Sequence, residues 1–266
     1  MKYEGVLNKM RTEWGHPIQY FLTLNKNFIN VNQLIGLNLQ VSFQGYQCLN
    51  CGKAKKIFRQ GFCYDCFTSS PAVGDWIMRP ELSTAHLGIE DRDLEYESKV
   101  QLQPHVVYLA VASDVKVGVT RKTQVPTRWI DQGASRAIEI VEVPNRYLAG
   151  ITEIALKDKF TDKTNWRKML QNEIAQVDLA EIRNSLELLL PEEVKPYYYT
   201  TTHDILELEY PVIQFPTKLK SLNLEKTPYF EGVLKGIKGQ YLLFDDGTVF
   251  NVRTYEGFVV SLGIGK

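Results

Sequence analysis

The sequence has little of the material from which several classes of protein are built. Its 266 residues include only four cysteines and four histidines. Four cysteines are too few for a disulfide-dense mini-protein, and an apolar content of 44% excludes a disordered chain. The longest apolar run, residues 106–112, is far shorter than the roughly 20 residues that a membrane-spanning helix needs. The composition therefore predicts a globular protein with no membrane partner.

Net charge is also absent, because 31 Lys and Arg residues balance 31 Asp and Glu residues. That balance excludes a protein that coats nucleic acid or membranes with its whole surface, but it allows local patches. Near the start, Glu4, Lys9 and Arg11 interrupt the region where a secretion signal is apolar. We therefore expect a cytoplasmic protein. The length predicts one large domain or two to three small ones.

All four cysteines fall in one short stretch. Cys48 and Cys51 form one CxxC pair, and Cys63 and Cys66 form a second pair after eleven intervening residues. Two such pairs are typical of a structural zinc site that four thiolates close. Disulfides or plain buried thiols are the alternative, which is weaker without a secretion signal. The spacing therefore predicts a zinc ribbon over residues 46–68.

Positive charge gathers around two segments. Residues 41–70 carry four bases against one acid, and residues 116–136 carry five bases against one acid. Zinc ribbons contact nucleic acid in some proteins and other proteins elsewhere, and basic loops favour nucleic acid. Solvated surface charge without a partner is the alternative. The bases predicted to bind DNA or RNA are Lys53, Lys55, Lys56, Arg59, Arg121 and Lys122.

Hydrophobic patterning predicts an α+β fold, with antiparallel β-rich terminal segments, the inserted ribbon and a small α/β core. Asp246-Gly247 predicts a hairpin. Strands are expected over residues 18–24, 37–43, 106–112, 116–120 and 137–143, helices over 126–133, 147–160 and 165–189, and an acidic linker over 84–99. The predicted domains are 1–45, 46–68, 100–190 and 200–266, and the last is expected to pack with the first.

A short similarity links the two ends of the chain. Residues 3–7 read YEGVL and residues 230–234 read FEGVL, and each is followed by another β-like run after a glycine, at Gly36 and Gly257. Two matches are as compatible with coincidence as with a repeat.

Several residues between 105 and 160 are suited to phosphate chemistry. Arg128 can bind two phosphate oxygens at once, Lys116 can supply positive charge or act as a base when buried, and Glu153 can hold Mg²⁺. Each of these residues also has a purely structural interpretation. Tyr108 fits a core position, Lys116 a solvated strand end, and Glu153 a helical pair with Lys157.

The same segment resembles the GIY-YIG nuclease superfamily. In that family two tyrosines on neighbouring strands flank the attacking water, an arginine on the next helix steadies the phosphate, and a glutamate holds a divalent metal. The stretches that carry the resemblance are residues 106–109, residues 116–120, Arg128-Trp129 and Glu153.

Carried over by position, the resemblance assigns the first tyrosine, the arginine and the glutamate to Tyr108, Arg128 and Glu153. Lys116 stands where the second tyrosine is expected, and Gln132 stands where the family frequently has a histidine. Because the missing phenol is a candidate base, the departure at Lys116 puts cleavage in question.

Ribbon and core together resemble an uncharacterised bacterial family known only as a domain of unknown function. We expect a nucleic-acid-binding protein with structural Zn²⁺. If it is an enzyme, the resemblance implies a metal-dependent endonuclease that uses Mg²⁺. A binding module that lacks catalysis and a zinc-stabilised scaffold for protein interaction remain as alternatives.

Overall fold

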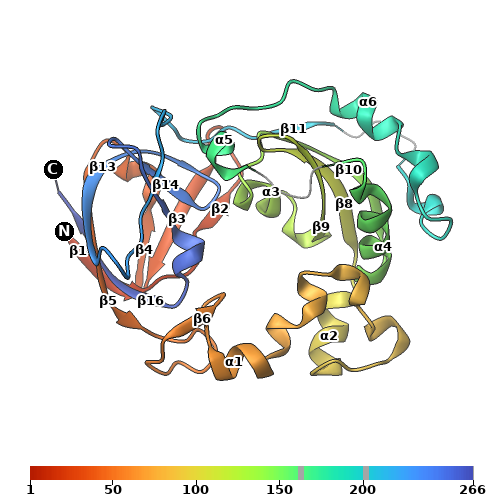
Figure 1. The fold of residues 1–266 in the computed structure, drawn as a ribbon, viewed down its shortest axis with the longest axis horizontal. Helices are drawn as coiled ribbons and strands as arrows, with labels where there is room; N and C mark the ends of the chain where they lie inside the picture. The colour runs from red at the N-terminus through yellow and green to blue at the C-terminus, as the bar shows by residue number, and fades with distance from the viewer. Residues whose placement is uncertain (161–164, 200–203, 266) are drawn as a thin grey trace.

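The computed structural model describes residues 1–160, 165–199 and 204–265. Its class is mixed α+β with antiparallel sheets, which confirms the predicted class. In Figure 1 the two ends of the chain form a β-rich part, and the middle of the chain forms a smaller α/β part beside it. The cysteine-rich segment lies along one edge between the two parts. Among the described residues, no helix is both long and apolar enough to span a membrane.

The largest sheet joins both ends of the chain in the order β1-β16-β5-β13-β14-β15-β12. Its strands are β1 (Lys2–Val6), β5 (Asn38–Tyr46), β12 (Lys220–Ser221), β13 (Tyr229–Lys238), β14 (Tyr241–Phe244), β15 (Thr248–Asn251) and β16 (Phe258–Ile264). A second sheet contains β2 (Arg11–Glu13), β3 (Gln19–Leu24) and β4 (Asn27–Asn30). We call residues 1–46 and 220–264 the β unit.

The β unit contains two copies of one motif. Residue 36 aligns with residue 257, and the same offset of 221 places β4 on β15 and the 3-10 turn η1 (Val31–Leu34) on η9 (Val252–Tyr255). Over residues 19–36 and 240–257, six of the 18 aligned residues are identical. They are Gln19/Gln240, Tyr20/Tyr241, Leu22/Leu243, Asn30/Asn251, Val31/Val252 and Gly36/Gly257.

Hydrogen bonds repeat with the motif. The Gly36 N–H donates to the Leu234 carbonyl at 2.7 Å, and the Gly257 N–H donates to the Leu7 carbonyl at 2.9 Å. These bonds join the two YEGVL-like segments to the opposite copy. The similarity between the chain ends is therefore part of a structural repeat.

The two copies meet where β5 pairs with β16. Val41 lies opposite Leu262, both are buried, and the offset of 221 also makes them counterparts. This register relates the copies by an approximate twofold axis through that pair. Since β1 pairs with β16 and β13 pairs with β5, neither copy completes its half of the sheet alone.

The middle of the chain forms a four-stranded sheet in the order β11-β10-β8-β9. Its strands are β8 (His105–Val111), β9 (Val115–Arg121), β10 (Arg136–Val143) and β11 (Leu206–Glu207). Every residue of β8 is buried, because Tyr108 and its neighbours on one face join the core of the β unit while Val107 and Leu109 pack with a second cluster. Coverage of both faces explains the unbroken apolar run.

Two helices flank this sheet. α3 (Thr127–Asp131) follows β9, and α4 (Arg146–Lys157) follows β10. Asn145 caps α4 by accepting the Leu148 N–H at 2.9 Å. On α4, Gly150 leaves room for the chain at Pro80–Leu82, since an added Cβ would lie 2.2 Å from the Glu81 nitrogen. The segment from residue 71 to residue 87, which we call the strap, therefore lies directly on α4.

The predicted linker over residues 84–99 is wrong, because part of it forms α2 (Leu94–Gln101). Asp93 caps the helix by accepting the Tyr96 N–H. Glu97 is fully buried and accepts the backbone N–H groups of residues 91–93. Its carboxylate therefore organises the chain that enters the helix.

The predicted continuous helix over residues 165–189 is also wrong. It consists of α5 (Trp166–Leu170) and α6 (Leu179–Asn184), followed by a 3-10 turn. Asn172 has a positive φ of 60°, which no helical residue adopts, and it ends the first segment.

Gly36→Ala and Gly257→Ala form a matched pair that tests how the repeat supports the cysteine-rich segment. Both glycines have positive φ, so each substitution costs about 1 kcal/mol of backbone strain. An added Cβ meets no atom within 4 Å at Gly36, but at Gly257 it lies 2.7 Å from Cδ1 of Ile57. We expect Gly257→Ala to lower the free energy of unfolding in urea more than Gly36→Ala does. Equal losses would contradict this contact.

Candidate functional site

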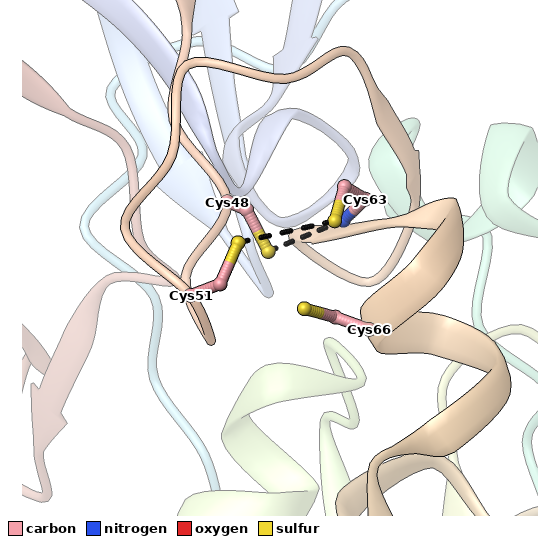
Figure 2. Close-up of side chains that lie close together, drawn as sticks. All are labelled: Cys48, Cys51, Cys63 and Cys66. Atoms are coloured by element: carbon pink, nitrogen blue, oxygen red, sulfur yellow. Dashed lines mark hydrogen bonds between the residues drawn. The ribbon is translucent and has the colours of Figure 1, made fainter.

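The four cysteines form one compact cluster. Figure 2 shows their sulfurs turned toward a common point, and all four Sγ atoms lie within 4.8 Å of one another. Cys48 and Cys51 lie in the loop after β5. Cys63 ends the hairpin of β6 (Ile57–Arg59) and β7 (Phe62–Cys63), and Cys66 lies on α1 (Tyr64–Ser69). All four are free thiols, so the cluster can hold a metal ion.

Backbone groups prepare the cluster for a cation. The Cys63 N–H donates to Sγ of Cys48 at 3.3 Å. Burial of Cys48 opposes ionisation, but backbone N–H groups of Cys51, Cys63 and Asn50 outweigh it and lower the pKa of the thiol to about 6. A thiolate is the form of cysteine that binds metals, so this environment favours the ligand form at Cys48. At Cys66 a hydrogen bond from Asn50 acts in the same direction, but burial and the other three thiols outweigh it and raise the pKa to about 11.

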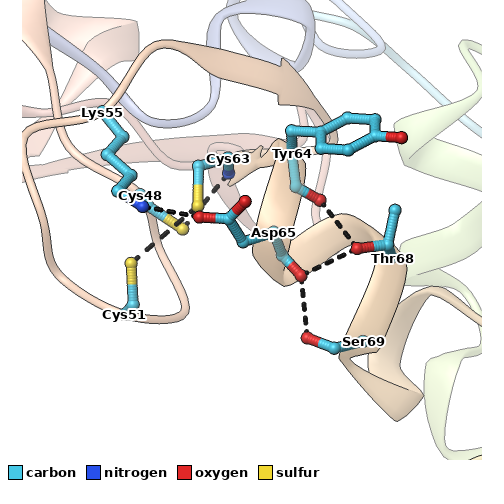
Figure 3. A network of polar contacts seen from close by, with 8 residues as sticks. All are labelled: Cys48, Cys51, Lys55, Cys63, Tyr64, Asp65, Thr68 and Ser69. Carbon is cyan, nitrogen blue, oxygen red and sulfur yellow. Dashed lines mark hydrogen bonds and ion pairs between the residues drawn. The ribbon is translucent and has the colours of Figure 1, made fainter.

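Three of the six bases predicted to bind nucleic acid have acidic partners. Lys55 forms an ion pair with Asp65 at 2.5 Å, which Figure 3 shows beside the cysteine cluster. Lys56 lies 3.5 Å from Glu225. Lys122 contacts Glu139 at 2.8 Å and Glu142 at 3.1 Å. Their charges are therefore partly balanced within the chain.

The other three bases have different surroundings. Lys53 and Arg59 are exposed on the ribbon, and the Arg59 guanidinium lies 5.5 Å from the centre of the Phe58 ring. Arg121 is half-buried at the end of β9, close enough to His105 and Arg146 to act on them electrostatically. The six bases thus do not form one patch.

The four residues of the predicted catalytic set come together from four elements. Tyr108 lies on β8, Lys116 on β9, Arg128 on α3 and Glu153 on α4. The charges of Arg128 and Glu153 both act on the Tyr108 phenol and on the Lys116 amine. Residues that are 45 positions apart in the chain therefore share one cluster.

The surroundings of Lys116 make its amine easier to deprotonate than that of an ordinary lysine. Burial, followed by the charge of Arg128, lowers the pKa of the Lys116 amine to about 8, while Glu153 opposes the shift. A lysine with this pKa is still mostly protonated at pH 7, but roughly a tenth of it is neutral, far more than of an unperturbed lysine.

Tyr108 is fully buried, and its burial raises the pKa of the phenol. Its hydroxyl donates to Oε1 of Gln132 at 3.0 Å. Gly118 on β9 lies against the ring, since an added Cβ would be 2.7 Å from the hydroxyl oxygen. The phenol is therefore held inside the protein, and its hydroxyl lies close to the Arg128 side chain.

Arg146 is a member of the cluster that sequence reasoning missed. Burial lowers the pKa of its guanidinium to about 10, and Glu153, Arg128 and Arg121 act on it electrostatically. Arg146 also donates to the carbonyls of Trp76 and Ile77 in the strap, at 3.0 and 2.8 Å. Its spacing of seven from Glu153 places both on one face of a helix, which is the signal that could have found it.

Contacts with the β unit fix the position of α3. Both carboxylate oxygens of Asp131 are occupied, one by Lys9 at 2.8 Å and the other by Gln240 at 2.8 Å. The Asp131 side chain is only 3% exposed. Because Asp131 is three residues after Arg128, these bonds set the helix that carries the arginine.

Comparison with known families matches residues 36–260 to the family described as "Protein of unknown function (DUF2797)". The chain belongs to this DUF2797 family. Neither the curated proteins nor the solved structures contain a match. The match spans the cysteine cluster, the core cluster (Tyr108, Lys116, Arg128, Arg146 and Glu153) and the second copy of the repeat as far as residue 260.

Cys48→Ala tests the metal centre. Because Cys48 is buried among the other thiols, its loss should remove a ligand that no neighbour replaces. We expect bound metal to fall from roughly one ion per chain to a small fraction of that, measured by elemental analysis of purified protein. Thr68→Ala on α1 is the control and should keep its metal. Wild-type protein without metal after purification in a metal-containing, reducing medium would contradict the assignment.

Proposed function

We propose that this chain binds nucleic acid and cleaves phosphodiester bonds in it. The observation that carries the proposal is the grouping of Lys116, Arg128 and Glu153 around the buried Tyr108. The resemblance to the GIY-YIG nucleases predicts the same grouping from the sequence. The family assignment itself names no activity, so the proposal rests on this geometry.

The metal in the cysteine cluster is proposed to be zinc. Four thiolates from two CxxC pairs suit Zn²⁺, and they leave no position open for a water molecule. Zinc here would hold the ribbon together and take no part in a reaction.

The charge balance of the core cluster suits a phosphate group. Lys116, Arg128 and Arg146 supply three basic groups, whereas Glu153 supplies the carboxylate that acts on them. Mg²⁺ usually binds through one or two carboxylates together with phosphate oxygens and water. Glu153 would therefore hold Mg²⁺ jointly with the substrate, and the ion would supply charge neutralisation at the phosphate.

The other steps of hydrolysis would be carried out by side chains of the protein. In hydrolysis the oxygen of water bonds to phosphorus, the bond to the leaving oxygen breaks, and the water proton passes to the leaving group. Neutral Lys116 would accept that proton from the water and pass it to the leaving oxygen, and Arg128 would bind two phosphate oxygens. Buried Tyr108 does not reach the solvent, so we assign it as a positioning residue for Gln132 and Arg128.

Glu153→Gln should abolish cleavage and spare binding. The substitution keeps the size of the side chain but removes the charge that holds a divalent ion. The measurement is binding to single-stranded, duplex and branched DNA and RNA over a salt series, followed by cleavage of the bound substrate by wild-type protein with Mg²⁺. Glu173→Gln, at an exposed position, is the matched control.

Three outcomes separate the candidate functions. Cleavage by wild type and none by Glu153→Gln supports the proposal. Binding without cleavage by either protein leaves a non-catalytic binding module. No binding to any nucleic acid, with metal confirmed in the sample, leaves a scaffold for protein interaction.

The pH profile tests Lys116 directly. If the neutral amine accepts the proton, kcat/KM should rise with pH and level off above the Lys116 pKa of about 8. Lys116→Arg keeps the positive charge but stays protonated. It should bind substrate normally and lose roughly a hundredfold or more in rate. A rate that falls as pH rises through 8 would instead show that the ammonium form is required.

A further inference from the structure

A cluster of exposed aromatic rings lies where β6 and the start of α1 meet, in residues 58–64, which we call the ribbon tip. Phe58 is 48% exposed and Tyr64 is 62% exposed. The ring of Phe58 packs edge-on against Tyr64 at 5.2 Å between centroids and against Phe67 at 5.1 Å. Exposure of this size leaves much of the apolar surface of the cluster in contact with water.

The ribbon does not need these two rings for its own core. Around the cysteines, the packed apolar side chains are Ile57 and Phe62. Phe58 and Tyr64 lie outside that cluster. Their exposure is therefore not explained by the folding of the metal centre.

Two grooves lie where the β6–β7 hairpin of the ribbon meets η9 of the second repeat copy. One, of about 560 Å³, is lined by Phe58, Tyr64 and Arg59 together with Thr254. The other, of about 540 Å³, is lined by Phe58 and Arg59 together with Arg253 and Thr254. Because Phe58, Arg59 and Thr254 line both, the two grooves adjoin each other at these residues.

Positive charge accompanies the rings. Arg59 and Arg253 are both exposed, and neither forms an ion pair with any residue that the structure describes. Two acids also line the grooves, and each accepts a hydrogen bond there: Glu256 from the backbone N–H of Lys9 at 3.1 Å, and Glu225 from the Tyr46 hydroxyl at 2.7 Å. The grooves therefore combine aromatic faces with two arginines that are available to an anion.

We propose that the ribbon tip binds an unpaired stretch of nucleic acid. Its bases stack on Phe58 and Tyr64, and its phosphates contact Arg59 and Arg253. Stacking needs base faces that a duplex hides, so the surface selects single-stranded DNA or RNA, including unpaired parts of a branched substrate. The inference rests on the proposed function in one respect, that the chain binds nucleic acid, and it does not require cleavage.

The test compares the double variant Phe58→Ala, Tyr64→Ala with wild type on single-stranded and duplex oligonucleotides of matched length, as DNA and as RNA. Affinity for single strands should fall roughly tenfold or more, with an unchanged salt slope, while duplex affinity stays the same. Arg253→Ala should reduce the salt slope by about one. The DNA and RNA arms identify which strand the surface takes.

Controls separate a lost contact from a damaged fold. Phe28→Ala removes a ring that is 58% exposed and stacked on Phe21 in the first repeat copy, and it should leave affinity unchanged. The conservative pair Phe58→Tyr, Tyr64→Phe keeps the stacking faces and should restore single-strand binding. Metal content of every variant should equal that of wild type.

Equal losses for duplex and single strands, or no loss in the double variant, would overturn the inference and leave the proposed function standing. Normal single-strand binding that depends on Phe58 and Tyr64, without any cleavage, would support the inference and reject the enzymatic proposal. If wild type binds no nucleic acid, both fail together.

Discussion

The pairing of β5 with β16 is the constraint on which the other parts depend. It joins the two copies of the repeat through Val41 and Leu262, and it brings residues from both ends of the chain into one sheet. The same pairing positions the ribbon. β5 leads directly into Cys48, β16 begins directly after Gly257, and the Gln47 N–H donates to the Gly257 carbonyl at 2.8 Å. The cysteine cluster therefore starts at a point that the sheet has already fixed. About 170 residues lie between the two copies, and the sheet still joins the copies.

Asp131 links the β unit to the candidate active site. Its partner Lys9 comes from the first repeat copy, and its partner Gln240 comes from the second. A carboxylate that is almost completely buried is costly unless it is paired, so α3 adopts the position in which both partners reach it. Gln240 also accepts the Met10 N–H at 2.7 Å, which joins the copies to each other at the same place. The helix that carries Arg128 is thus fixed only when both ends of the chain have assembled.

The sequence predicted what local patterns determine. The CxxC pairs placed the four cysteines, and an unbroken apolar run placed β8, whose two covered faces require it. It could not predict the acidic partner of Lys56, because that partner, Glu225, is far away in the chain. Nor could it predict the partners of Lys55 and Lys122, which depend on how the hairpin and the sheet fold. The break at Asn172 depends on one backbone angle that the apolar pattern does not record. Arg146 could not be identified from the sequence, because only the folded strap provides carbonyls for it.

The two repeat copies share the order of their elements but differ where the ribbon meets the second copy. In the first copy Asn32 serves the fold, since its side chain accepts the Tyr20 N–H and donates to the Ile18 carbonyl, both at 2.9 Å. Its counterpart in the second copy is Arg253, which is exposed and lines the groove beside the ribbon. A structural amide and a solvent-facing guanidinium at equivalent positions are not interchangeable for packing. Arg253 therefore lacks the structural role of Asn32, which leaves its guanidinium on the surface where the proposed contact with a phosphate would occur.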